Sequence, residues 1–124
     1  MKPFPILVLV AGLAACTAAP ERDAGVRAPA ARVTGPAVSC LDTYRVSESL
    51  VHDDYTIDFR VNGGQTYRNT LPYRCSGLGF EKRFGYVLSI PRLCSLDVIT
   101  VLYSDGARGA SCGLGPFVPV EVAR

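Results

Sequence analysis

The residues His52-Asp53-Asp54 place an imidazole beside two carboxylates. Such a group can bind a metal ion or exchange protons with a substrate, because imidazole and carboxylate side chains are common metal ligands and general acids or bases. Aspartate is also frequent in tight turns, where its side chain accepts hydrogen bonds from the backbone. We favour the turn and keep His52, Asp53 and Asp54 as weak candidates for a metal or acid–base site.

The segment Gly109-Ala110-Ser111-Cys112-Gly113 matches the G-x-S-x-G pattern of serine hydrolases. In those enzymes the serine occupies a strand-to-helix turn of a large α/β sheet, and a histidine base follows it along the chain. The chain has one histidine, His52, and it precedes Ser111. We therefore interpret the glycines as loop geometry around a disulfide. We predict no catalytic residue, no cofactor and no enzymatic activity.

Cysteine 16 ends an N-terminal segment that has the basic start and apolar stretch of a secretion signal. Its last residues, Leu13-Ala14-Ala15-Cys16, resemble the lipobox of bacterial lipoproteins. The resemblance implies that residues 1–15 are a signal peptide and that the Cys16 thiol carries a diacylglyceryl group with acyl chains such as palmitate. Two chains give a stable membrane anchor. The alternative is an ordinary cleaved signal with a stray cysteine.

The residue after the lipobox, Thr17, bears on the destination of the protein. Many bacteria retain lipoproteins in the inner membrane through an Asp at this position. The resemblance therefore implies the periplasmic face of the outer membrane in a Gram-negative bacterium.

Residues 16–36 read as the lipidated cysteine and a tether. Residues 17–36 contain six Ala and three Pro, with scattered charges and no aromatic residue. Proline interrupts any helix, and no apolar periodicity develops, so this composition is typical of a linker. We expect it to hold a folded domain, residues 37–124, clear of the lipid headgroups.

The other four cysteines are Cys40, Cys75, Cys94 and Cys112. An even set in an exported domain favours two disulfides, which stabilise mainly by restricting the unfolded chain. Structural zinc is the alternative, but its ligands usually occur in close pairs and these cysteines are far apart. Of the three pairings that four cysteines allow, we prefer Cys75 with Cys94 and Cys40 with Cys112.

Short stretches in which apolar and polar residues alternate are expected to form the strands that position the cysteines and the candidate site residues. Such alternation with turn signals between the stretches, and without a helical period, predicts an all-β domain: a small five- or six-stranded antiparallel barrel or sandwich stapled by two disulfides. Pro119 argues for an edge in the last strand. The expected strands are 43–51, 55–61, 65–71, 83–90, 98–103 and 117–122.

The hairpin between the second and third of these strands has a register that can be predicted. A three-residue loop, Asn62-Gly63-Gly64, pairs Phe59 with Tyr67 on the core face, whereas a two-residue loop would place polar residues there. It also pairs Asp58 with Arg68 on the outer face of a half-buried strand. Gly64 is then expected in a left-handed conformation.

Four aromatic residues are each followed by arginine, which could suggest bases stacked on rings and phosphates bound by arginine. In a strand, neighbouring side chains point to opposite faces, so we expect the rings in the core and the arginines in solvent. The formal net charge of +2 is too small for binding nucleic acid by counterion release, so we predict no nucleic-acid partner. The pairs are Tyr44-Arg45, Phe59-Arg60, Tyr67-Arg68 and Tyr73-Arg74.

Several stretches of the domain carry a resemblance to known proteins: Cys40, residues 53–57, residues 67–72 with Cys75 and Gly77-Leu78, residues 93–97 and residues 112–117. In these stretches the chain resembles a family of small exported proteobacterial proteins, many of them lipoproteins, known only as a domain of unknown function. The resemblance implies export and a cysteine-stapled fold, but no activity, substrate or catalytic residue.

The function we expect is a non-enzymatic periplasmic lipoprotein, held at the membrane by its anchor, that binds an envelope protein or a peptidoglycan-related partner. Loops on a rigid β scaffold commonly carry such binding, which directs attention to residues 72–82 and 104–116. By analogy of fold alone, an inhibitor of a cell-wall-cleaving enzyme is the alternative. A small metal-dependent enzyme using His52 with Asp53 or Asp54 is less favoured, and the oligomeric state stays open.

Overall fold

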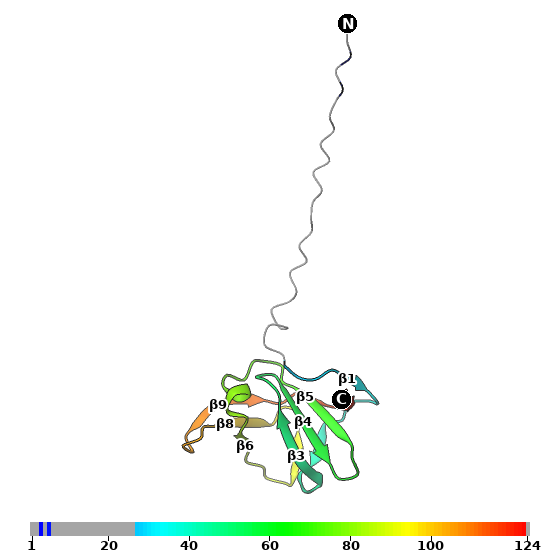
Figure 1. Cartoon of the computed structure of the whole chain (residues 1–124). Helices are drawn as coiled ribbons and strands as arrows, with labels where there is room; N and C mark the ends of the chain where they lie inside the picture. The colour runs from blue at the N-terminus through cyan, green and yellow to red at the C-terminus, as the bar shows by residue number, and fades with distance from the viewer. Residues whose placement is uncertain (1–2, 4, 6–26, 124) are drawn as a thin grey trace.

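The structure is a computed structural model that describes residues 3, 5 and 27–123 (Figure 1). The lipobox with Cys16 and the first part of the expected tether lie outside the described residues. None of the helices found in the described part is long and apolar enough to cross a membrane. The described chain is built from antiparallel strands joined by two disulfides, which confirms the predicted fold class.

The largest sheet contains five antiparallel strands in the order β1-β10-β5-β4-β3. Strands β3, β4 and β5 follow one another as hairpins, so the side of this sheet from the β3 edge to the central β5 is made from neighbouring sequence. The bounds are β1 Ala31–Val33, β3 Val46–Val51, β4 Thr56–Val61, β5 Thr66–Thr70 and β10 Phe117–Val122.

Two smaller sheets complete the domain. One has the order β6-β8-β9 and the other pairs β2 with β7. The described residues thus contain ten strands, four of them only two or three residues long. The sequence patterns predict the longer ones except β9, which forms where a loop was expected. The bounds are β2 Cys40–Asp42, β6 Phe84–Gly85, β7 Arg92–Cys94, β8 Val98–Leu102 and β9 Arg108–Gly113, with a 3-10 turn at Thr43–Arg45 and a short helix α1 at Leu78–Glu81.

The core lies between the five-stranded sheet and the β6-β8-β9 sheet. Ile57 and Phe59 of β4 are buried together with Ile99 and Val101 of β8. The ring of Phe59 packs edge-on against Phe117 of β10, with the centroids 5.5 Å apart. Strand β8 lies in the middle of its sheet, between β6 and β9.

The predicted hairpin register is confirmed. Phe59 lies opposite Tyr67 and Asp58 opposite Arg68, and Gly64 has a φ of +89°. The predicted half-burial of β4 was wrong, because Asp58 on the outer face is only 1% exposed. Around Asp58 this outer face is covered by the side chains of His52 and Arg68, which pair with the carboxylate, whereas Arg60 farther along the same face is exposed.

Strand β10 is not an edge strand, which corrects the expectation drawn from Pro119. Strand β1 pairs with it on the outer side, so residues assigned to the tether form part of the sheet and the folded chain begins before residue 37. Pro119 is tolerated because its carbonyl accepts a 2.9 Å hydrogen bond from the backbone N–H of Thr34, just beyond the end of β1. Pro119 has no N–H to donate toward β1, but β1 ends at Val33 opposite Val120, so no hydrogen bond between the two strands is lost. Figure 1 shows β1 beside the C-terminus.

The cysteine pairing also differs from the prediction. The bonds are Cys40–Cys94 and Cys75–Cys112. The prediction was wrong because the strand expected over residues 83–90 ends at Gly85. The chain then leaves that sheet, and β7 pairs with β2 so that Cys94 lies directly opposite Cys40. Cys112 on β9 is left for Cys75, which is fully buried after β5.

Candidate functional site

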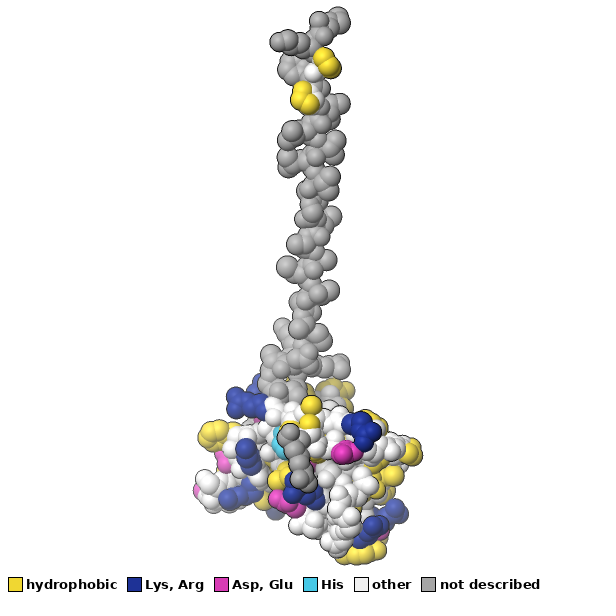
Figure 2. Space-filling view, turned by 45° about the vertical axis from the view of Figure 1, so that its right-hand side comes forward, with side chains coloured by type: hydrophobic (Ala, Val, Ile, Leu, Met, Phe, Trp, Pro, Cys, Tyr) yellow, Lys and Arg dark blue, Asp and Glu magenta, His cyan; other side chains and the backbone are white. Residues whose placement is uncertain are grey.

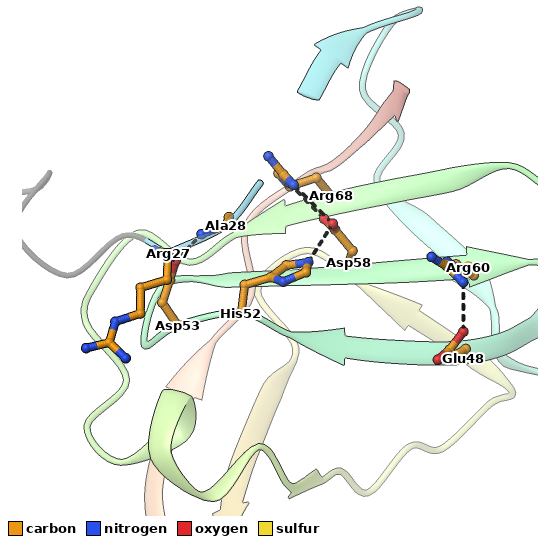
Figure 3. Close-up of polar contacts among 8 residues, drawn as sticks. All are labelled: Arg27, Ala28, Glu48, His52, Asp53, Asp58, Arg60 and Arg68. Atoms are coloured by element: carbon orange, nitrogen blue, oxygen red, sulfur yellow. Dashed lines mark hydrogen bonds and ion pairs between the residues drawn. The ribbon is translucent and has the colours of Figure 1, made fainter. Parts of the chain in front are cut away.

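The buried carboxylate of Asp58 on β4 accepts hydrogen bonds from both His52 and Arg68 (Figure 3). His52 Nε2 donates to Asp58 Oδ2 at 2.8 Å, because a carboxylate only accepts. Arg68 on β5 donates through Nε to Oδ1 at 2.8 Å and through Nη2 to Oδ2 at 3.1 Å. The predicted register brings Arg68 opposite Asp58, and the hairpin turn brings His52 to the same face.

The protonation of Asp58 follows from this arrangement. Burial raises the pKa of its carboxyl group, but hydrogen bonds from Arg68 and His52 and the attraction of these two side chains lower it more. The pKa therefore lies below its ordinary value, and Asp58 is ionised at neutral pH. A carboxylate held by three hydrogen bonds and buried beneath its partners stabilises the sheet and is poorly placed to meet a substrate.

The two other candidate carboxylates serve the turn between β3 and β4. Asp53 accepts hydrogen bonds from the backbone N–H groups of Tyr55 at 2.7 Å, Arg27 at 2.8 Å and Ala28 at 3.2 Å. Asp53 therefore holds the backbone of Arg27 and Ala28 against the turn between β3 and β4 (Figure 3). This is the turn interpretation of the sequence, which the structure supports.

Asp54 is also engaged by structural partners. Its Oδ2 receives Arg74 Nε at 2.8 Å, and its Oδ1 receives the backbone N–H of Gly79 at 2.7 Å. Consequently His52, Asp53 and Asp54 do not converge on one point. In the described part of the chain, no three His, Cys, Asp or Glu side chains lie close enough together to hold a metal ion.

The G-x-S-x-G segment forms the last part of strand β9, where the sequence predicted a loop. The hydroxyl groups of Ser111 and Thr100 are hydrogen bonded to each other at 3.0 Å across β9 and β8. Cys112 is held in its disulfide with Cys75. A serine within a strand lacks the strand-to-helix turn that positions a hydrolase nucleophile.

A cleft of about 720 Å³ opens beside the turn. Its lining includes the side chains of Arg27, Arg74 and Lys82, together with Phe80 on α1, which is 89% exposed. The hydrogen bond to Asp54 raises the pKa of Arg74, so this guanidinium is always charged. The cleft joins basic groups to an exposed aromatic ring in the 72–82 connection, where a binding surface was predicted.

Of the four aromatic–arginine pairs, Phe59-Arg60 follows the prediction fully and Tyr67-Arg68 follows it only in part. Phe59 is buried and Arg60 is exposed, but Arg68 is turned to Asp58 instead of solvent. Tyr44 and Tyr73 are exposed, which contradicts the expectation that they enter the core, because both lie outside the strands. Alternation of faces does not apply to residues in turns and loops.

Comparison of the chain with protein-family models, with curated proteins and with solved structures found no match. Of the groups that line the cleft, the sequence indicates His52, Asp53 and Asp54 as individual residues. It indicates Phe80 and Lys82 only through the 72–82 connection, and Arg27 not at all. The available signal was an aromatic residue followed by charges within the glycine-rich 77–82 stretch.

Proposed function

We propose that the protein is a lipid-anchored periplasmic lipoprotein whose β domain is a non-enzymatic binding module of the cell envelope. The anchor is Cys16, proposed from its lipobox. The observation that supports this function best is the pair of disulfides, Cys40–Cys94 and Cys75–Cys112. Disulfides persist in oxidising compartments such as the periplasm, and they divide the five cysteines into four that pair and one that is free to carry lipid.

The binding role is supported by the way the domain uses its reactive groups. His52 and Asp58 bind each other, and Asp53 and Asp54 bind backbone N–H groups or Arg74. These contacts leave the candidate acid–base groups in structural roles. The exposed surface of the cleft offers basic and aromatic side chains, which suit recognition better than turnover.

The anchor is tested by expressing the full chain in a Gram-negative host and comparing it with the Cys16→Ser variant. The expected result is that the parent chain partitions into detergent and that its N-terminal peptide begins at Cys16 with the mass of a diacylglyceryl group. The variant should lose both properties. A parent chain whose N-terminal peptide lacks acyl mass would overturn the anchor.

The binding role is tested by cross-linking the protein in intact envelopes and purifying its adducts. One reproducible envelope partner that is lost in a cleft variant, Lys82→Glu, supports a binding module. Inhibition of a wall-cleaving enzyme such as lysozyme would assign the inhibitor class instead. Turnover of a substrate that requires metal and is lost in His52→Ala would overturn the non-enzymatic proposal.

A further inference from the structure

Exposed basic and aromatic side chains gather at the end of the domain where the described chain begins. We call this surface the tether face and define it by Arg27, Tyr73, Arg74, Phe80 and Lys82. Four of them line the cleft beside the turn, and Tyr73 lines an adjoining groove of about 650 Å³ that also includes Arg74. Figure 2 shows Lys and Arg side chains on both sides of this end, with the histidine between them.

We propose that the tether face docks on an anionic bilayer surface, with its rings at the level of the lipid headgroups and its cations against lipid phosphates. This inference rests on the proposed lipid anchor, because the anchor supplies the membrane. Aromatic side chains favour the interface between water and hydrocarbon. Lysine and arginine near an anionic surface each strengthen binding about fivefold.

The position of the chain's exit selects the bilayer as the occupant. Ten residues, 17–26, separate the proposed anchor from Arg27. A flexible chain of that length spans on the order of 17 Å, and even fully extended it reaches only about 35 Å. Asp53 fixes the backbone of Arg27 at the turn, so this end of the domain is the one closest to the lipid.

The opposite end of the sheet cannot reach the membrane as easily. Tyr44 precedes β3, whereas the turn with Asp53 follows it. The six residues of β3 separate the two ends by about 20 Å. Tyr44 is also exposed, which makes it a matched reference for an aromatic side chain outside the tether face.

Exposure and charge both favour docking of the tether face. Phe80 is 89% exposed and Tyr73 is 82% exposed, so their apolar surface is available for contact with lipid. Two of the three acidic groups at this end are already engaged: Asp53 is buried with its oxygens bonded to backbone N–H groups, and Asp54 bridges Arg74 and α1. The third, Glu81 of α1, is partly exposed beside Phe80 and Lys82 and offsets one of the three cations. The side chains that project outward are therefore mainly positive and aromatic.

The test uses the fact that the chain contains no tryptophan. Phe80→Trp introduces a single reporter on the tether face, and Tyr44→Trp introduces one at the opposite end. The lipidated proteins are reconstituted in vesicles of brominated phosphatidylcholine with 30% phosphatidylglycerol, and tryptophan quenching by bromine is measured. We expect several-fold stronger quenching in Phe80→Trp, and equal quenching in the two proteins would overturn the proposal.

The role of charge is tested in the same vesicles. Adding Lys82→Gln to Phe80→Trp should lower the ratio of docked to undocked protein about fivefold. Arg45→Gln, which removes an exposed charge next to Tyr44, should leave it unchanged. Identical quenching in vesicles of brominated phosphatidylcholine alone would overturn an anionic surface as the docking partner.

A second preparation separates this inference from the proposed anchor. The chain from residue 16 onward contains all of residues 27–123, and Cys16 is its one cysteine outside the two disulfides. Coupling Cys16 to a maleimide phospholipid therefore anchors the domain whether or not cells lipidate it. Strong Phe80→Trp quenching in this form, with no acyl mass on protein from cells, would support the tether face and overturn the natural anchor.

Discussion

The Asp58 carboxylate is the buried charge on which the outer face of the sheet depends, so Asp58→Asn should destabilise the domain strongly. The substitution keeps the shape of the side chain but leaves the Arg68 guanidinium, whose side chain is 16% exposed, without its counter-charge. Breaking a buried ion pair by removing one partner costs about 3 kcal/mol or more. A domain of this size has a total stability of about 5–15 kcal/mol, so the loss is a large fraction of it.

The free energy of unfolding is measured by urea titration of the oxidised protein. With a slope of about 1.5 kcal/mol per molar urea, Asp58→Asn should lower the midpoint by about 2 M. Glu48→Gln is the matched control, because Glu48 also pairs with an arginine on this face, Arg60, at 3.2 Å, but both side chains are about half exposed. An exposed pair contributes at most about 1 kcal/mol. Equal losses in the two variants would refute the reasoning.

The pH dependence provides an independent check. Because the pKa of Asp58 is lowered in the folded state, its ionised form stabilises the fold at pH values above the ordinary unfolded pKa of about 3.9. This contribution is lost as the pH falls through the lowered pKa. The difference between the parent and Asp58→Asn should therefore persist down to about pH 5 and shrink below about 4. A difference that is unchanged at pH 2 would contradict the ionised carboxylate.

Three further contacts are tested by substitution in the same urea titration. Gly115→Ala should lower the free energy of unfolding by about 3 kcal/mol, because its methyl carbon would lie 2.3 Å from a carbonyl oxygen of β5. Gly113→Ala is the control: its methyl group meets nothing within 4 Å, and it should change this free energy by less than about 1 kcal/mol. Asn69→Ala removes two buried hydrogen bonds to the backbone of Gly115 and should cost about 2–4 kcal/mol; a loss below that of Gly113→Ala would contradict this contact. Replacing Cys75 and Cys112 by Ala opens a loop of sequence separation 37 and should cost about 4 kcal/mol, while non-reducing peptide mapping of the parent should recover that pair.

The sequence could predict the hairpin of β4 and β5 because its determinants are local. The alternation in Thr56–Val61 defines two faces, and the turn at Asn62-Gly63-Gly64 then fixes which residues lie opposite each other. The pairing of Asp58 with Arg68 follows from that register. The addition of His52 does not follow from it alone, because it depends on how the neighbouring hairpin turn brings the ring over β4.

The cysteine pairing could not be predicted because it depends on contacts between distant segments. Cys40 and Cys94 meet only because β2 pairs with β7, 54 residues later in the sequence. The residues after Gly85 keep an alternating pattern, yet they leave the sheet, and Val87 is exposed. A local pattern reports which residues could face a core, whereas tertiary pairing decides which strand continues.

The second disulfide links this long-range architecture to the tether face. Cys75 follows Arg74 directly, its backbone N–H donates to the carbonyl of Asp54 at 2.8 Å, and its sulfur is bonded to Cys112 on the other sheet. The connection that carries Arg74 and Phe80 is therefore fixed both to the turn between β3 and β4 and to strand β9 of the β6-β8-β9 sheet. A surface that is rigid before it binds loses less conformational entropy on docking. Replacing Cys75 and Cys112 by Ala should accordingly weaken the proposed membrane docking, although it changes no charge and no aromatic side chain of the tether face.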